Sequence, residues 1–302
     1  MILAVDVGNT HVVLGVMEDL ETRHMFRLQT DPKRTDSEYA VMMHQMLTIA
    51  GYNPHDFEGA IISSVVPPLT GTLKQAVKIV TNCTPMVIGP GLKTGLNIRI
   101  DDPATLGADL VVGAVAALHK YTAPLIVNDM GTATTVTCMD KNGSFLGGSI
   151  IAGVNLCLNA LSSGTSQLPA IDLNYTGKAI GSNTIDCMRA GAVYGTAGML
   201  DGLIDRMQEE LDGKATVGAC GGLAPMIIPH CRHEIHLEDD LLMLGLGLIY
   251  KKLARKYYKS ASVRPTLALA LFRRSVYPQA STARPYKSSA APFRRGDPWS
   301  PA

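Results

Sequence analysis

The chain has 302 residues, 46% of them hydrophobic and 18% charged, and its formal net charge is +1. This length is typical of about two globular domains. The sequence holds no apolar run of about 18 residues, which argues against a transmembrane helix.

The charge is unevenly distributed along the chain. Residues 251–302 hold 12 of the 27 Lys and Arg residues and one of the 26 acids, so this segment carries +11 and the first 250 residues carry −10. An acidic body and a tail without a recognisable motif do not favour nucleic-acid binding. We expect the tail, residues 253–302, to be either disordered or the product of a frameshift.

The N-terminal segment and the cysteines lead us to expect a cytoplasmic protein. The N-terminus shows no signal peptide, since it lacks a basic region and a small-residue cleavage site. The six cysteines form no CxxC pair. This usage favours buried thiols in a reducing cytoplasm.

Apolar runs, turn residues and helical periodicity divide the body into alternating strands and helices. In chain order we expect strands at 2–7 and 12–16, a helix at 36–50, a strand at 59–66, a helix near 69–81, a strand at 86–88 and a helix from 102 to 121. This alternation indicates an α/β fold.

The opening pattern then occurs a second time. The segment ILAVDVGNTHVVLGV at 2–16 aligns with PLIVNDMGTATTVTCM at 124–139. Asp6 corresponds to Asp129, Gly8 to Gly131 and Asn9 to Thr132. Two copies of a strand–turn–strand unit predict a duplicated α/β domain.

The residues of this turn suit a metal-bound polyphosphate. Gly8 leaves the backbone open to a ligand, and successive N–H groups in such a turn form an anion-binding concavity. Asn9 and Thr10 add side-chain donors, and Asp6 can hold Mg²⁺ or its water shell. One copy also fits an ordinary hairpin. Two copies facing each other across a cleft could bind a triphosphate from both sides.

A third glycine-rich segment, TVGACGGLAP at 216–225, follows a short expected strand. It allows either a nucleotide base or phosphate to approach the backbone, or a close crossing of a helix and a strand. The P-loop and the dinucleotide-binding GxGxxG motif are both missing. The segment HCRHEIH at 230–236 lacks an HExxH pattern and is interpreted as a surface loop rather than a metal cluster.

Several motifs together resemble the type III pantothenate kinases, a family within the superfamily of acetate and sugar kinases, Hsc70 and actin. They are DVGNT at 6–10, NPHDFEGAIISSVVP at 53–67, DDPATLGAD at 101–109, NDMGTATT at 128–135, GGSIIAGVNLCLNALSSGTSQLP at 147–169 and GSNTIDCMRAGAVYG at 181–195.

The resemblance implies an α/β fold of duplicated actin-like, ribonuclease H-like ATPase domains with a nucleotide cleft between them, at 1–117 and 118–252. It implies phosphorylation of pantothenate by ATP with Mg²⁺, the first step of coenzyme A biosynthesis. It further implies a monovalent cation, K⁺ or NH₄⁺, and a cytoplasmic homodimer without nucleic-acid or membrane partners.

The resemblance also implies residue roles. Asp109 is the expected catalytic base, Asp129 the potassium ligand, and Asp6 a magnesium ligand, directly or through water. The expected ATP contacts are Asp6, Val7, Gly8, Asn9, Thr10, His11, Val12, Val13 and Thr132. The expected substrate contacts are Gly107, Ala108, Asp109, Leu110 and Thr184.

Two positions depart from the family pattern. Position 110 is Leu where the family has Arg, a natural bidentate partner for the pantothenate carboxylate. Position 100 is Ile where many members have an aromatic residue. Two alternatives therefore stay open: a kinase of another small hydroxyl substrate, or a catalytically weak regulatory homologue that binds nucleotide.

Overall fold

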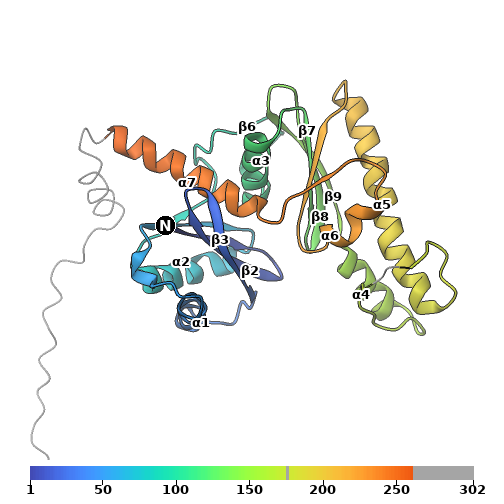
Figure 1. The fold of residues 1–302 in the computed structure, drawn as a ribbon, viewed down its shortest axis with the longest axis horizontal. Coiled ribbons are helices and arrows are strands. Elements are labelled where there is room, and N and C mark those ends of the chain that lie inside the picture. Colours follow the sequence, from blue (N-terminus) through green and yellow to red (C-terminus); the bar gives the residue numbers. More distant parts are fainter. Residues whose placement is uncertain (175–176, 261–302) are drawn as a thin grey trace, which may run out of the picture.

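The structure is a computed structural model that describes residues 1–174 and 177–260 (Figure 1). It contains two β-sheets. The first has the order β3-β2-β1-β4-β5. Its strands are β1 (Ile2–Val7), β2 (His11–Glu18), β3 (Glu21–Gln29), β4 (Gly59–Ser64) and β5 (Met86–Val87).

The second sheet has the order β11-β10-β7-β8-β9-β6. Its strands are β6 (Asn97–Ile98), β7 (Leu125–Met130), β8 (Ala133–Met139), β9 (Ser144–Ala152), β10 (Thr216–Cys220) and β11 (His236–Leu237). Apart from β6, the second sheet repeats the first: two antiparallel pairings, β9-β8-β7 like β3-β2-β1, are followed by two parallel pairings. The duplicated α/β fold predicted from the sequence is therefore confirmed.

The described helices form layers around these sheets. They are α1 (Asp36–Ile49), α2 (Pro67–Thr81), α3 (Ala108–Lys120), α4 (Val154–Gly164), α5 (Thr184–Glu210), α6 (Ala224–Ile227) and α7 (Leu241–Ser260), with 3₁₀ turns at Pro54–Asp56, Pro103–Thr105 and Ile228–His230. No helix in the described part of the chain has both the length and the apolar character needed to cross a membrane.

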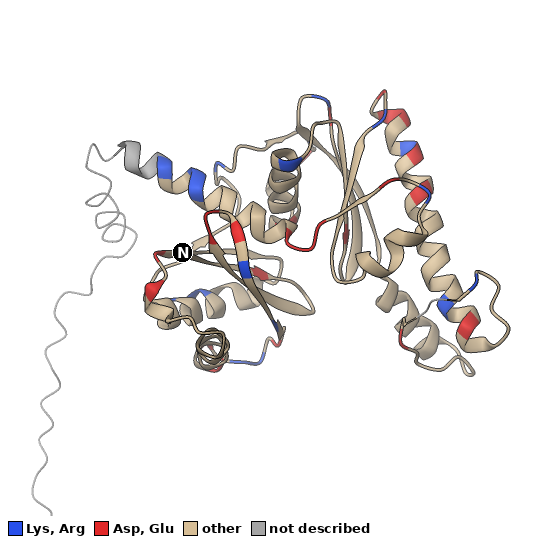
Figure 2. Ribbon diagram, viewed as in Figure 1, with Lys and Arg blue, Asp and Glu red and all other residues tan. Residues whose placement is uncertain are grey.

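Helices α3 and α7 lie between the two sheets and contact each other (Figure 1). Val112 of α3 and Leu246 of α7 pack against the first sheet, whereas Ala117 of α3 and Leu241 of α7 pack against the second. Each helix follows the last strand of its repeat, β5 or β11. The two central helices therefore join the lobes, and blue bands in Figure 2 mark Lys and Arg residues on the C-terminal halves of both.

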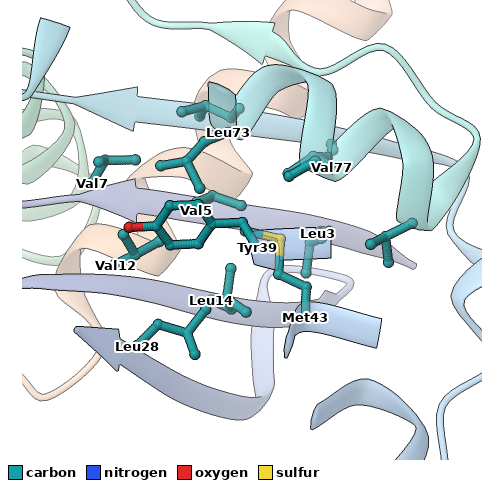
Figure 3. Packing of buried hydrophobic residues seen from close by; sticks show 14 of the residues in the cluster. Leu3, Val5, Val7, Val12, Leu14, Leu28, Tyr39, Met43, Leu73 and Val77 are labelled. Carbon is teal, nitrogen blue, oxygen red and sulfur yellow. The ribbon is translucent and has the colours of Figure 1, made fainter. Parts of the chain in front are cut away.

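The outer helices cover the other face of each sheet. α1 and α2 pack on the first sheet, and α4, α5 and α6 pack on the second. Figure 3 shows Tyr39 and Met43 of α1 and Leu73 of α2 directed at Leu3 and Val5 of β1. Because helices cover β1 on both faces, nearly all of its side chains are buried, each contributing about 1.5–3 kcal/mol for a large apolar group.

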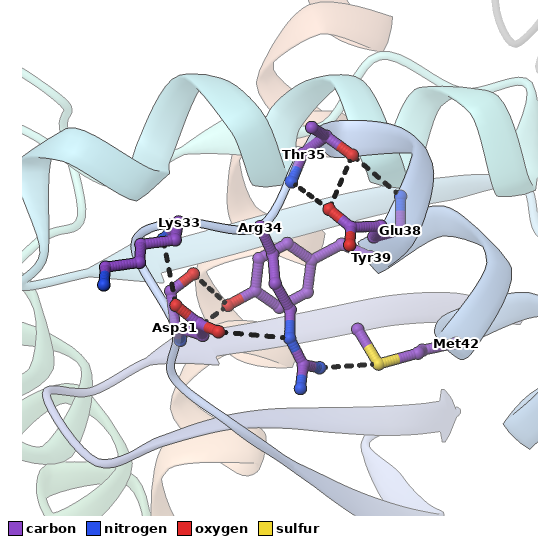
Figure 4. Close-up of polar contacts among 7 residues, drawn as sticks. All are labelled: Asp31, Lys33, Arg34, Thr35, Glu38, Tyr39 and Met42. Carbon is purple, nitrogen blue, oxygen red and sulfur yellow. Dashed lines mark hydrogen bonds and ion pairs between the residues drawn. The ribbon is translucent and has the colours of Figure 1, made fainter.

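Helix α1 begins at a capping box. The Thr35 side chain accepts from the backbone N–H of Glu38, and the Glu38 carboxylate accepts from the backbone N–H of Thr35 (Figure 4). The Tyr39 hydroxyl accepts from the N–H of Asp31 at 2.9 Å and donates to its carbonyl at 3.1 Å. These bonds fix the segment that connects β3 to α1.

The expected elements differ from the structure at several places, of which three have a clear physical reason. The helix near 69–81 begins earlier, at Pro67, because proline fits the first turn of a helix. The helix expected from Asp102 begins only at Ala108, because Pro103 opens a 3₁₀ turn after which Leu106 is extended. Strand β3 was not predicted, since its sequence ETRHMFRLQ is largely polar at an exposed edge of the sheet.

The expectation that all six cysteines are buried is wrong. Cys157 of α4 and Cys187 of α5 are exposed, and Cys231 is half-buried. The reason is that α4 and the start of α5 form an outer layer with only one face covered. The tail expected at 253–302 lies outside the described residues from position 261 onward.

Candidate functional site

The two repeated turns meet at the same place. The Thr10 and Thr132 hydroxyls are hydrogen-bonded at 2.6 Å, although 122 positions separate them in sequence. Thr10 follows β1 and Thr132 follows β7, the central strands of the two lobes. The two turns thus lie at one shared opening between the lobes, as the sequence predicted.

The turns are built alike. The N–H of Gly8 donates to the carbonyl of His11 at 3.0 Å, and the N–H of Gly131 donates to that of Ala133 at 3.1 Å. Neither glycine has a positive φ, so neither turn depends on a left-handed conformation. A Cβ at Gly8 would lie 3.3 Å from the His11 carbonyl oxygen, so close approach is what favours glycine at this position.

Thr30 supports the first turn, although no sequence motif marks it as part of the site. Its hydroxyl donates to the carbonyl of Gly8 at 2.6 Å, and its N–H donates to the carbonyl of Thr10 at 2.9 Å. Thr30 stands next to Asp31, whose backbone is held by Tyr39 (Figure 4). Tyr39, which is part of the core of the first lobe, therefore helps to hold the turn in place through Asp31 and Thr30.

The predicted ATP contacts differ in their exposure to solvent. Asn9, Thr10, His11 and Thr132 are exposed at the opening. Val7 and Val12 are buried in the core, and Val13 is half-buried, so Val7 and Val12 could contribute only backbone groups.

Three carboxylates lie close enough to influence one another. Burial is the main cause that raises the pKa of Asp6 to about 7, and Asp109 and Asp129 raise it further, while the Ser63 hydroxyl lowers it. Burial also raises the pKa of Asp129 to about 6, with an added effect of Asp109 and an opposing hydrogen bond from Cys220. Buried acids that repel one another form a site that favours cations.

Asp109 stands in the first turn of α3 and is half-buried. Burial raises its pKa, whereas the N–H of Leu110, which donates to Oδ1 at 2.8 Å, lowers it. A Cβ at Gly107 would collide with this carboxylate oxygen, so glycine leaves the space that the carboxylate occupies. Leu110 packs in the apolar cluster that includes Ile100.

Neighbouring strands add polar groups beside the two loop aspartates. Ser63 of β4 is in register with Asp6, and Thr135 of β8 is in register with Asp129. The Ser63 hydroxyl interacts with the Asp6 carboxylate, whereas among the described residues the buried Thr135 side-chain oxygen has no hydrogen-bond partner. Such an oxygen beside a carboxylate suits a metal ion, since it needs a positively charged or donating partner.

The described residues contain no group of three or more His, Cys, Asp or Glu side chains able to hold a metal ion by themselves. Asp6 and Asp129 are carboxylates of the kind that bind Mg²⁺, which protein sites commonly hold through one or two carboxylates while nucleotide phosphates and water complete its coordination. The segment at 230–236 is also not a metal cluster: the Asp201 carboxylate accepts from the N–H groups of Arg232 and His233.

The third glycine segment lies beside the second turn. A Cβ at Gly221 would overlap the backbone of Met130 at the end of β7, and Gly221 has φ +95°. Glycine at 221 thus allows a close backbone approach, but its neighbour is the end of the paired strand β7 and not a crossing helix. Gly222 has no neighbour around its would-be Cβ within 4 Å, so a planar group can approach the backbone there.

Thr184 is the one predicted site residue that lies apart. It is the exposed first residue of α5 and lines a separate pocket of about 580 Å³ with Gly181 and Cys187. α5 covers the face of the second sheet opposite to α3, which carries Asp109 (Figure 1). A single chain therefore does not bring Thr184 and Asp109 together.

Comparison with known proteins decides the family. A sequence model of type III pantothenate kinase matches residues 2–206. The chain belongs to the type III pantothenate kinase family. It is 42% identical over 252 residues to a protein of that name from Halalkalibacterium halodurans, covering 83% of this chain and 99% of the relative, and 39% identical over the same length to one from Moorella thermoacetica.

Solved structures show the same fold. MreB 5 of Spiroplasma citri, bound to AMPPNP, superposes with a TM-score of 0.52 at 10% identity, over 86% of this chain and 98% of that one. The fold is that of the duplicated actin-like ATPases, as the resemblance implied.

Proposed function

We propose that this chain transfers the terminal phosphoryl group of ATP to the hydroxyl of pantothenate, forming 4'-phosphopantothenate in the first step of coenzyme A biosynthesis. Membership of the type III pantothenate kinase family supports the reaction. The single structural observation that carries it is the hydrogen bond between Thr10 and Thr132, which joins the two phosphate-binding turns at one opening. We retain 1–117 and 118–252 as the domains that supply one turn each.

Phosphoryl transfer depends mainly on positioning and on neutralising charge. In this proposal the N–H groups of the first turn and the hydroxyls of Thr10 and Thr132 orient the triphosphate. Asp109 accepts the proton of the substrate hydroxyl, and its raised pKa makes it a better acceptor than an exposed carboxylate. Gly107, Ala108 and Leu110 form the wall of the substrate pocket beside it.

The carboxylates of the two turns would hold the cations. Asp6 would bind Mg²⁺, directly or through water, and Asp129 would bind K⁺ or NH₄⁺. Bound Mg²⁺ would neutralise charge that develops on the phosphates. The unpaired hydroxyl of Thr135 lies in register with Asp129 and would add an oxygen toward the monovalent cation.

We propose a homodimer as the working unit. Ile150 of β9, Leu156 and Leu161 of α4 are exposed, and burial of such side chains against a second copy is favourable. Because Thr184 lies across the second sheet from Asp109 of its own chain, its contact with pantothenate would be made in the partner's site. Because the reaction needs ATP, we propose that the protein works in the cytoplasm.

The experiment uses the purified full chain with pantothenate, Mg-ATP and potassium, and measures ADP release together with the mass of the product. We expect one ADP for each phosphorylated pantothenate and loss of both in the Asp109→Asn variant. A rate no higher than that of Asp109→Asn would reject the proposal. Light scattering of the same samples reports the mass of the assembly.

A second function rests on Leu110, which stands in an apolar cluster where the family has Arg. A hydroxyl substrate without a carboxylate would fit this apolar surface better than pantothenate does. A panel of small alcohols in the same assay distinguishes the two, and nucleotide binding without phosphorylation of any substrate would favour the regulatory homologue.

A further inference from the structure

Another cavity lies between α3 and α7, away from the two turns, and we call it the rear pocket. It has a volume of about 730 Å³, within the range of sites for small molecules. Its walls come from the C-terminal halves of α3 and α7, from the connection at 94–96 and from Leu20 in the β2–β3 hairpin.

The rear pocket is separate from the site of phosphoryl transfer. Asp109 is in the first turn of α3, whereas His119 lines the rear pocket near the end of that helix. Ten residues of α-helix span about 15 Å. The hairpin residue Leu20 is likewise at the end of β2 opposite to the first turn.

The lining combines an apolar floor with a cationic rim. Val115 and Leu118 of α3 and Leu248 of α7 form apolar surface. Lys251, Lys252 and Arg255 of α7 and His119 of α3 also line the pocket, and no acid does. Figure 2 shows the corresponding basic bands on α7.

These cations have no carboxylate partner among the residues that the structure describes. The nearby acids Glu18 and Glu21 of the hairpin both pair with Arg23. Lys251, Lys252 and Arg255 take part in no described salt bridge. Three positive charges around one cavity make its electrostatic potential positive, which attracts anions.

The backbone makes room for one of these cations. Gly95 has φ +95°, and a Cβ there would overlap Nζ of Lys252. This glycine ends the segment GPGLKTG at 89–95, which resembles part of a P-loop with the wrong spacing and has no part in the nucleotide site. The segment instead presents Thr94 and Gly95 to the rear pocket.

We propose that the rear pocket binds a small molecule that carries an anionic group on an apolar body. Its apolar body would cover Val115, Leu118 and Leu248, and its anionic group would lie between Lys251, Lys252 and Arg255. The chain's own residues 261–302 are an unsuitable occupant, since they hold seven Lys and Arg residues and one acid. The pocket adds a second ligand site to the kinase.

The test compares two probes that differ by one charge: 8-anilino-1-naphthalenesulfonate and the uncharged N-phenyl-1-naphthylamine. The full chain is kept saturated with Mg-ADP so that the phosphate-binding turns are occupied. The test variant is Lys251→Glu/Lys252→Glu. The control is Lys74→Glu/Lys78→Glu, which makes the same charge change at two exposed lysines of α2.

We expect the sulfonate to bind the unaltered chain with a 1:1 stoichiometry and to bind the test variant about tenfold more weakly. The control should bind it like the unaltered chain, and the uncharged probe should not distinguish the three proteins. Failure of the unaltered chain to bind the sulfonate, equal binding by the test variant, or equal weakening in the control would overturn the proposal. Circular dichroism melting verifies that all three proteins are folded.

Discussion

Replacing Asp6 by Asn should stabilise the ligand-free protein while removing its kinase activity. Asp6 lies near the end of β1, where burial is the main cause of its raised pKa and Asp109 and Asp129 raise it further. Folding therefore brings three acids together that the unfolded chain keeps apart and solvated. Asparagine has nearly the same shape and removes one of these charges.

The pKa of Asp6 gives the size and the sign of the effect. It rises from 3.8 in the unfolded chain to about 7 in the folded protein. Because Asp6 binds its proton more tightly in the folded protein, its contribution to the free energy of unfolding is greatest below pH 4. This contribution falls between pH 4 and 7 and is then constant. At 1.36 kcal/mol for each pH unit the loss is about 4 kcal/mol. Since the acids share their mutual repulsion, we expect Asp6→Asn to gain about 2–4 kcal/mol at pH 8.

Urea unfolding followed by circular dichroism measures this gain, with EDTA present and without potassium or ammonium. The unaltered chain should lose stability between pH 5 and 8, and Asp6→Asn should lose less. Glu209→Gln, at an exposed acid of α5, should change stability by less than about 0.5 kcal/mol. If Asp6→Asn were less stable than the unaltered chain at pH 8, or the two pH profiles ran parallel, the argument from the burial and mutual repulsion of these carboxylates would be wrong.

Four further outcomes follow from the site. Asp109→Asn should lower kcat by about 10²–10⁴-fold with little change in the KM for ATP, measured by steady-state ADP release. Thr10→Val and Thr132→Val should each raise the KM for ATP, and in a double-mutant cycle their effects should couple by about 1 kcal/mol; additive effects would show that the hydrogen bond is irrelevant. Thr135→Val should raise the potassium concentration for half-maximal activity at least severalfold without changing the KM for ATP, and an unchanged potassium titration would exclude Thr135 as a neighbour of the cation. Tyr39→Phe should cost about 1–3 kcal/mol in urea unfolding, because the N–H of Asp31 loses its partner in a part-buried position.

Local sequence patterns determined the strands that carry the site. The β-branched residues of Ile2–Val7 and Leu125–Met130 specify strands, and the turns after them recur with the same residue types. Each strand has an aspartate as its last residue but one, and repetition of this unit was enough to predict the duplication. These features could be read from the sequence because each depends on residues close together in the chain.

Only the tertiary structure decided which distant groups meet. The bond between Thr10 and Thr132 joins side chains 122 positions apart, and the bond from Thr30 to the carbonyl of Gly8 joins groups 22 positions apart. The polar edge strand β3 forms because β2 provides its hydrogen-bonding partner, although its own side chains give little signal. The separation of Thr184 from Asp109 likewise follows from the sheet that lies between α3 and α5. Sequence spacing carries no information about such distances, since the packing of the two lobes around α3 and α7 sets them.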